Sequence, residues 1–210
     1  MRYFKKQSSP TSFEDWKVSK GRSATYRNIP VGIKEELRKS LAQEQSGICC
    51  YCGISLKDNI HIEHFKPQRN FRSRALDYGN LHASCMGKKY IKSEEEELDF
   101  CGHSKLDWYD DELLVSPLDP NCENYFRYSF DGSIEDQDHR AAKETIKRLS
   151  LNSYLIKNQR FAAIDGIMET IDLEDTEDIK SCILYLETPN GEGELSSFSY
   201  IIVELLKTLI

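Results

Sequence analysis

The stretch CCYCGISLKDNIHIEHFKP, residues 49–67, carries three cysteines, two histidines and one glutamate within nineteen residues. Thiolate and imidazole are common zinc ligands, and the spacing of Cys49 and Cys52 is typical of a zinc knuckle, in which one tight turn supplies two ligands. Two interpretations compete for this stretch. It is either a purely structural zinc site, or a zinc site that supports a second, catalytic metal.

A tetrahedral zinc site needs two further ligands from outside the knuckle. Cys85 in HASCMG and Cys101 in FCGHSK each lie close to a glycine that permits a tight turn. The spacing alone leaves several residues open as the second pair of ligands: Cys85, Cys101, Cys122, His82 and His103.

Composition and cysteine usage bound the class of protein. The chain has 210 residues, of which 39% are hydrophobic and 30% charged, and an odd number of cysteines, seven. The N-terminus has no apolar run of a signal peptide, and the apolar C-terminal stretch YIIVELLKTLI is short and interrupted by Glu204 and Lys207. We therefore expect a cytoplasmic protein with reduced thiols, bound metal and no membrane partner.

Charge is distributed unevenly along the chain, whose net charge is −7. From Asp165 to the end there are eleven acidic and two basic residues, a local net of −9, so the rest of the chain carries +2. Between His64 and Lys92 only Asp77 opposes seven basic residues, which predicts an electropositive patch beside the metal-rich stretch. Its members are Lys66, Arg69, Arg72, Arg74, Lys88, Lys89 and Lys92.

Periodicity divides the chain into three regions. Residues 1–45 contain an irregular segment, 1–30, followed by an amphipathic helix over 33–45 that ends before Gly47. Residues 46–132 combine short strands with long polar loops, among them the acidic insert SEEEELD. The fold class we expect is α+β, because the strands are few, short and local.

Residues 133–210 are mostly helical by pattern. The stretch FRYSFDGSI, which spans the boundary, alternates around Asp131-Gly132 and predicts a hairpin. Four segments with apolar residues every three to four positions predict helices. They are AAKETIKRL, LIKNQRFAAIDGIMETI, IKSCILYLE and FSYIIVELLKTLI.

The segment HIEHFKP has neither spacing of the two common zinc-protease motifs, which excludes that reading. It contains Glu63 directly followed by His64, with Pro67 three residues on and Asn80 after thirteen more. An acid–histidine pair and then an asparagine, bracketed by cysteines, resembles the HNH endonucleases and their zinc-stabilised ββα-metal core. The resemblance covers residues 46–109, where the knuckle, EHFKP, NLHASC and CGHSK occur in the family's order.

Within that family the chain is similar to the HNH subunit of Septu-type and retron-associated phage-defence systems. The similarity rests on EQSGICCYCG, the long insertion between Cys85 and Cys101, and LLVSPLDPNCENYFRYSFDGSI. It implies a nucleic-acid substrate and a large ATPase as partner. The charge split adds an expectation that this partner contacts the C-terminal helices or a basic N-terminal segment, Arg2, Lys5 and Lys6.

The resemblance also implies residue roles. Cys49, Cys52, Cys85 and Cys101 would be the structural zinc ligands. His64 would be the general base, Asn80 an orienting residue, and Lys105 a third catalytic residue, which matches the basic residue often found at its position. Glu63 would be a ligand of the catalytic metal. The family's third position usually follows the last cysteine, where this chain has Gly102, so we assign the second ligand to His103.

These residue types suit phosphodiester hydrolysis. A neutral histidine accepts a proton from water near pH 7, and a divalent ion held by a carboxylate and an imidazole stabilises charge on the phosphate. Such a site favours Mg²⁺ or Mn²⁺, with Zn²⁺ or Ni²⁺ also open. The alternative is a catalytically inactive zinc-dependent subunit that binds nucleic acid or protein, which the departure at Gly102 favours.

Overall fold

The computed structural model of the chain describes residues 1–57, 60–87 and 99–210. Within this part the fold is α+β, as predicted, with seven α-helices and two small antiparallel sheets of two strands each. The acidic insert SEEEELD and the basic residues Lys88, Lys89 and Lys92 lie outside the described residues, either wholly or in greater part. No helix in the described ranges is long and apolar enough to cross a membrane.

The N-terminal region contains two helices, α1 (Thr11–Lys20) and α2 (Val31–Glu44). The prediction that residues 1–30 are irregular is therefore wrong for α1, and Pro10 is the residue that caps this helix instead of breaking the chain. Proline suits a helix start because the first turn needs no backbone N–H from it. Helix α2 likewise begins directly after Pro30, two residues before the predicted start.

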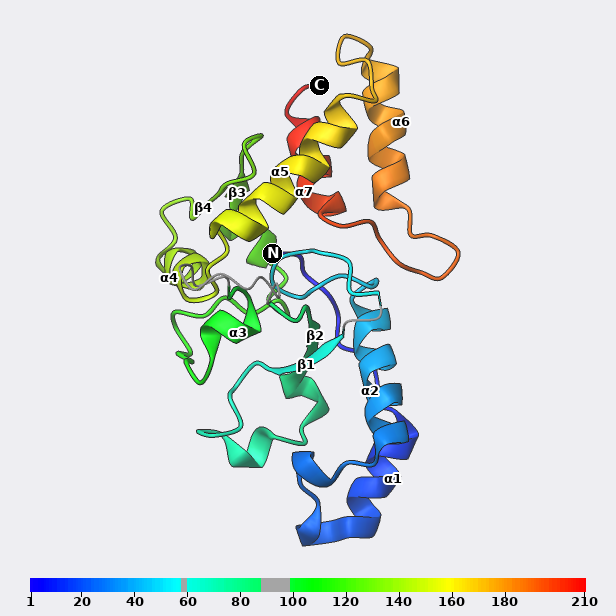
Figure 1. Cartoon of the computed structure of the whole chain (residues 1–210), viewed down its shortest axis with the longest axis vertical. Helices are drawn as coiled ribbons and strands as arrows, with labels where there is room; N and C mark the ends of the chain where they lie inside the picture. The colour runs from blue at the N-terminus through cyan, green and yellow to red at the C-terminus, as the bar shows by residue number, and fades with distance from the viewer. Residues whose placement is uncertain (58–59, 88–98) are drawn as a thin grey trace, which may run out of the picture.

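The central region is built on a hairpin of β1 (His61–His64) and β2 (Leu81–Ser84), followed in the chain by the short helix α3 (Gly102–Lys105). The strands pair antiparallel, with Glu63 opposite His82 and His64 opposite Leu81. Both strands lie against α2 (Figure 1). Successive side chains of a strand point to opposite faces, so Glu63 and His64 face different surroundings.

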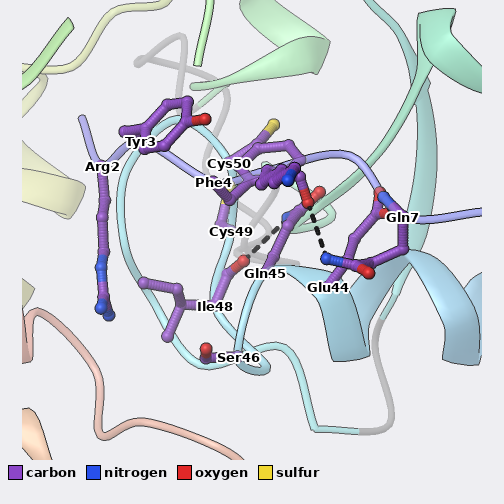
Figure 2. Close-up of a pocket in the computed structure, with 11 residues that line it drawn as sticks. Arg2, Tyr3, Phe4, Gln7, Glu44, Gln45, Ser46, Ile48, Cys49 and Cys50 are labelled. Carbon is purple, nitrogen blue, oxygen red and sulfur yellow. Dashed lines mark hydrogen bonds between the residues drawn. The ribbon is translucent and has the colours of Figure 1, made fainter. Parts of the chain in front are cut away.

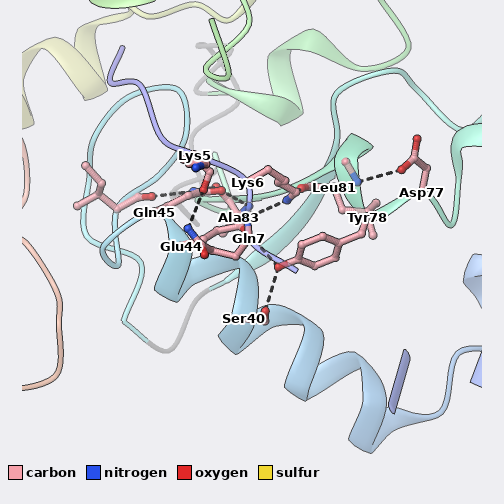
Figure 3. A network of polar contacts seen from close by, with 12 residues as sticks. Lys5, Lys6, Gln7, Ser40, Glu44, Gln45, Asp77, Tyr78, Leu81 and Ala83 are labelled. Carbon is pink, nitrogen blue, oxygen red and sulfur yellow. Dashed lines mark hydrogen bonds and ion pairs between the residues drawn. The ribbon is translucent and has the colours of Figure 1, made fainter. Parts of the chain in front are cut away.

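Side-chain hydrogen bonds fasten β2 to the end of α2 (Figure 3). The Gln45 amide donates to the carbonyl of Ala83 at 2.7 Å and accepts from the backbone N–H of the same residue at 2.8 Å. Lys6 donates to Glu44 and to the carbonyl of Leu81, which ties the N-terminal segment to the same strand. The hairpin thus has a fixed position relative to both N-terminal elements.

The C-terminal region begins with the predicted hairpin, β3 (Arg127–Tyr128) and β4 (Ile134–Glu135), which turns at Gly132 with a φ of +79°. The four predicted helices follow and begin or end within three residues of the expected positions. They are α4 (Arg140–Arg148), α5 (Tyr154–Met168), α6 (Thr176–Glu187) and α7 (Ser199–Lys207).

The hydrophobic core runs through all three regions without a break. Its buried residues extend from Phe13 and Leu37 in the N-terminal helices, through Ile62 in β1, to Ile201 and Leu206 in α7. Helices α5, α6 and α7 gather at one end of the molecule and α1 lies at the other, with the β1–β2 hairpin between them (Figure 1). Backbone hydrogen bonds from Leu195 to Ser46 and from Phe198 to Gly53, both 2.8 Å, tie the segment before α7 to the segment that carries the cysteine knuckle.

Candidate metal centre and surrounding polar site

Four buried cysteines from three separate segments meet beside the hairpin. Cys49 and Cys52 come from the knuckle, where the backbone N–H of Gly53 donates to the carbonyl of Cys49 at 3.1 Å, Cys85 directly follows β2, and Cys101 precedes α3. Their four sulfur atoms all lie within 4.8 Å of one another. None of the four forms a disulfide.

The spacing of the sulfur atoms is that of a tetrahedral site. Cys49 Sγ lies 3.9 Å from Cys101 Sγ, and Cys52 Sγ lies 3.8 Å from Cys85 Sγ. A tetrahedron with zinc–sulfur bonds of about 2.3 Å has sulfur–sulfur edges of about 3.8 Å. These four residues are the ones that the resemblance implied, and the group could hold a metal such as zinc.

One thiol of the cluster is favoured as a thiolate. Burial opposes ionisation throughout the cluster and raises the pKa of Cys101, yet hydrogen bonds from the surrounding thiols, Cys101 first, hold the pKa of Cys49 well below its usual range. A thiolate is the form that binds metal. Among the described residues, these cysteines are the one group of three or more His, Cys, Asp or Glu side chains placed closely enough to share an ion.

The other candidates for the second pair of ligands lie elsewhere. Cys122 is buried near the N-terminal amine, and His82 is buried between the rings of Phe4 and Phe65, with centroid distances of 5.4 and 5.8 Å. Cys50, next to the knuckle, lines a cavity of about 240 Å³ between the N-terminal segment and the knuckle (Figure 2). The backbone N–H of Cys50 donates to the carbonyl of Ala83, which anchors the knuckle to β2.

Glu63 faces α3 and pairs with the lysine of that helix. Lys105 Nζ lies 2.9 Å from Glu63 Oε1, and the Tyr51 hydroxyl donates to the same oxygen at 3.1 Å. Lys105 is only 2% exposed and also donates to the carbonyls of His64 and Phe65, both at 3.1 Å. The lysine therefore joins the helix to the end of β1 and neutralises the carboxylate.

Gly102 is the residue that permits this arrangement. A Cβ atom built there would lie 2.4 Å from Glu63 Oε2, closer than real Cβ atoms approach. The close approach of Glu63 therefore explains why position 102 is a glycine, although the resemblance expects another residue type there. Any larger residue at position 102 would displace the Glu63 carboxylate.

Two histidines lie beside each other on the Glu63 side of the hairpin. The rings of His61 and His103 are 5.4 Å apart, and His103 Nδ1 is buried without a hydrogen-bond partner among the described residues. Burial lowers the pKa of His61, while the nearby Glu63 opposes this shift. The sequence motifs did not indicate His61 as a site residue, although the two-residue period of a strand places it on the same face of β1 as Glu63.

His64 occupies the opposite face and is 8% exposed. Its Nε2 lies 3.1 Å from the carbonyl of Ala75, so this nitrogen carries the proton of the neutral ring, and Nδ1 accepts from the Gln68 amide at 3.3 Å. The edge of the ring meets Tyr26 at a centroid distance of 4.6 Å. Burial lowers the pKa of His64 to about 4, so the ring is neutral near pH 7.

Asn80 holds the loop between the two strands. Its Oδ1 accepts from the backbone N–H of Lys66 at 2.8 Å, and its Nδ2 donates to the carbonyls of Lys66 and Arg74 at 3.0 and 3.1 Å. The side chain is buried and makes no hydrogen bond to His64 within the described ranges. The loop that Asn80 fixes contains both partners of the His64 ring, Gln68 and Ala75.

Three of the four described cations of the predicted electropositive patch form ion pairs with aspartates. Lys66 pairs with Asp111 at 2.9 Å and Arg69 with Asp107 at 3.3 Å, and Arg74 pairs with Asp77. Asp111 and Asp107 lie about forty positions after the cations with which they pair, beyond the stretch from His64 to Lys92 in which the patch was predicted. Arg72 is the patch member that has no ion pair among the described residues.

Comparison with known proteins adds no family assignment. No protein-family model matches the chain, and no curated protein is similar to it in sequence. The likeness to the HNH endonucleases therefore rests on the motifs of the sequence alone.

Proposed function

We propose that the chain is a metal-dependent HNH endonuclease that hydrolyses phosphodiester bonds of nucleic acid. The observation that carries the proposal is the state of His64, a buried, neutral imidazole whose Nε2 is committed to Ala75 and whose Nδ1 is left as an acceptor. A ring held in this way presents one nitrogen to a single polar neighbour. A general base needs such a free acceptor nitrogen, and the lowered pKa of about 4 keeps the ring neutral while making it a weaker base than a free imidazole.

In this proposal His64 Nδ1 takes a proton from a water that occupies the position of the Gln68 amide. Asn80 acts as a positioning residue, because the loop it fastens carries the carbonyl that orients His64. Lys105 is also a positioning residue, since its ammonium group is buried against Glu63 and two carbonyls. This role replaces direct participation of Lys105 in the reaction.

In the same proposal, Glu63 and His103 would hold a catalytic divalent ion on the other face of β1. Glu63 Oε2 makes no hydrogen bond in the described part of the chain, and His103 Nδ1 is buried and unpartnered there, so one carboxylate and one imidazole are left as donors. Mg²⁺ and Mn²⁺ bind through one or two protein ligands together with waters and substrate phosphates. When bound, such an ion would neutralise charge on the phosphate and the leaving oxygen.

The resemblance supports a role as effector nuclease in a phage-defence complex with an ATPase. The acidic C-terminal half favours a protein partner there over nucleic acid, because affinity for nucleic acid rests mainly on phosphate contacts. Leu184 and Tyr185 of α6 are 67% and 69% exposed and offer apolar contacts for that partner. Lys6 is less suited to the contact, because it is held by Glu44 and Leu81.

A second candidate function is an inactive zinc-dependent subunit that binds nucleic acid or protein. The specific observation in its favour is the Lys105 ammonium 2.9 Å from Glu63, where it competes with a metal ion for the carboxylate. In this case the zinc cluster would stabilise the fold and no bond would be cleaved.

A cleavage assay with metal titration decides between the two candidates. Purified chain, alone and with its ATPase, is incubated with duplex DNA, single-stranded DNA and tRNA in the presence of Mg²⁺ or Mn²⁺. The nuclease proposal expects metal-dependent cleavage that His103→Ala and Glu63→Gln reduce, while zinc content stays at one per chain. Binding without cleavage under every condition would favour the inactive subunit.

A further inference from the structure

The segment of residues 17–39, from α1 to the middle of α2, is strongly basic. Residues 17–39 contain seven basic and two acidic residues, a net of +5, whereas the chain from Asp165 onward has a net of −9. The seven are Lys17, Lys20, Arg22, Arg27, Lys34, Arg38 and Lys39. This segment lies outside the patch that the sequence predicted.

The segment lies directly against the His64 face of the hairpin. Tyr26 belongs to a single 3-10 turn, Tyr26–Asn28, and its ring meets the His64 ring edge-on at 4.6 Å. Lys34 Nζ in α2 lies 4.4 Å from the centroid of the Tyr26 ring. Lys17 Nζ donates to the carbonyl of Leu76 in the loop between the strands, which brings the end of α1 to the same place.

The cations of this segment differ from those of the β1–β2 loop in what they contact. Three of the four described loop cations form ion pairs with aspartates. In the segment, Lys17 pairs with Glu14 and Arg38 with Glu35, but four exposed cations have no ion pair within the described residues. These four are Lys20, Arg22, Arg27 and Lys39.

We propose that this segment, with Arg22 and Arg27 on either side of Tyr26, binds the phosphate backbone of the nucleic acid and directs it to His64. The inference rests on the proposed function and names the substrate-binding surface of that site. Guanidinium groups contact phosphate oxygens through paired N–H donors, and cations free of carboxylate partners lose no ion pair on binding. The acidic helices at the far end of the molecule would repel the same polyanion.

The test is the salt dependence of binding, measured by fluorescence anisotropy with short duplex DNA, single-stranded DNA and RNA over about 50 to 200 mM salt. The variant is full-length chain carrying Arg22→Ala and Arg27→Ala. The matched control carries Lys143→Ala and Lys147→Ala, which removes two exposed cations from α4. Zinc content and thermal unfolding verify that both variants are folded.

We expect the Arg22/Arg27 variant to bind about tenfold or more weakly, with the slope of log affinity against log salt shallower by about 1.5 to 2, and the control to change little. Cleavage by the variant should show a raised KM with kcat nearly unchanged. An equal loss in both variants, or no loss in the Arg22/Arg27 variant, would overturn the inference. So would binding to anionic lipid vesicles with no binding to any nucleic acid.

The outcomes separate this inference from the proposed function. His64-dependent cleavage that is insensitive to Arg22 and Arg27 would refute the binding surface and leave the nuclease intact. Weakened, less salt-sensitive binding in a protein that never cleaves would support the surface and refute the nuclease.

Discussion

The two polar clusters beside the β1–β2 hairpin differ in whether every side chain in the cluster has an interaction partner. In the cysteine cluster four identical ligands from three segments meet with sulfur–sulfur distances of 3.8 and 3.9 Å, as one tetrahedral ion requires. Around Glu63, a carboxylate, a lysine and two histidines meet, and the lysine already neutralises the carboxylate. The four thiols of the first cluster are placed so that one ion could bind all of them, whereas in the second cluster His103 Nδ1 has no hydrogen-bond partner among the described residues.

Under the proposed function, the two clusters have different roles: the cysteine cluster is a structural metal site and the cluster around Glu63 is a catalytic one. A structural metal site uses all its ligands on the ion, whereas a catalytic site keeps positions open for water and substrate. Removing a member of the first cluster should therefore damage the fold, and removing a member of the second should damage activity or local stability. The following predictions test this contrast.

The largest effect on stability should come from the cysteine cluster. Cys101→Ser, or chelation of the metal, should abolish zinc binding and unfold the central region, since structural zinc contributes on the order of 10 kcal/mol in small domains. Metal analysis and thermal unfolding measure both effects. Cys182→Ser on α6 is the control and should retain zinc and stability. A native protein that contains no zinc would contradict the assignment.

A smaller but still large effect should follow from Lys105→Met. The substitution leaves the buried Glu63 carboxylate without its cation, which typically costs about 3–5 kcal/mol. The double variant Lys105→Met/Glu63→Gln should recover part of the loss, because no unpaired charge then remains. Urea unfolding of the two variants measures the difference. Equal stability of wild type and Lys105→Met would show that the ion pair has no such role.

The smallest of these effects should come from Gly102→Ala. The new methyl group overlaps Glu63 Oε2, and overpacking of this kind costs about 1–3 kcal/mol. The control is Gly166→Ala in α5, where a Cβ meets no atom within 4 Å, so helix propensity should leave stability unchanged or improve it by about 0.5–1 kcal/mol. If both variants behave alike, the close approach of Glu63 to Gly102 does not constrain the site.

Elements whose pattern lies within one short stretch of the sequence were predicted correctly. Helical periodicity predicted α2 and the four C-terminal helices, and Asp131-Gly132 predicted the β3–β4 hairpin. Helix α1 was missed because only Phe13 and Trp16 of its residues are buried, too few to make a periodic stripe. The cysteine knuckle was likewise a local signal, and only its second pair of ligands had to be taken from the resemblance.

Long-range pairing is what the sequence could not reveal. Lys105 was assigned to catalysis, but it lies against Glu63 and 42 positions separate the two in the chain. Two cations of the predicted basic patch, Lys66 and Arg69, pair with Asp111 and Asp107 for the same reason. The orientation of His64 depends on the Ala75 carbonyl and the Gln68 amide, both set by the conformation of a loop without regular strands.

The most direct test of the central claim compares His64→Ala with His61→Ala in a cleavage assay with Mg²⁺ or Mn²⁺, with and without the ATPase. Loss of a general base lowers the rate by about 10²–10⁴, so His64→Ala should be barely active while its zinc content and fold remain intact. His61→Ala should retain much more activity, because His61 is neither the proposed base nor a proposed metal ligand, although its ring lies 5.4 Å from that of His103. Cleavage at the wild-type rate by His64→Ala would contradict the assignment of His64 and, with it, the proposed mechanism.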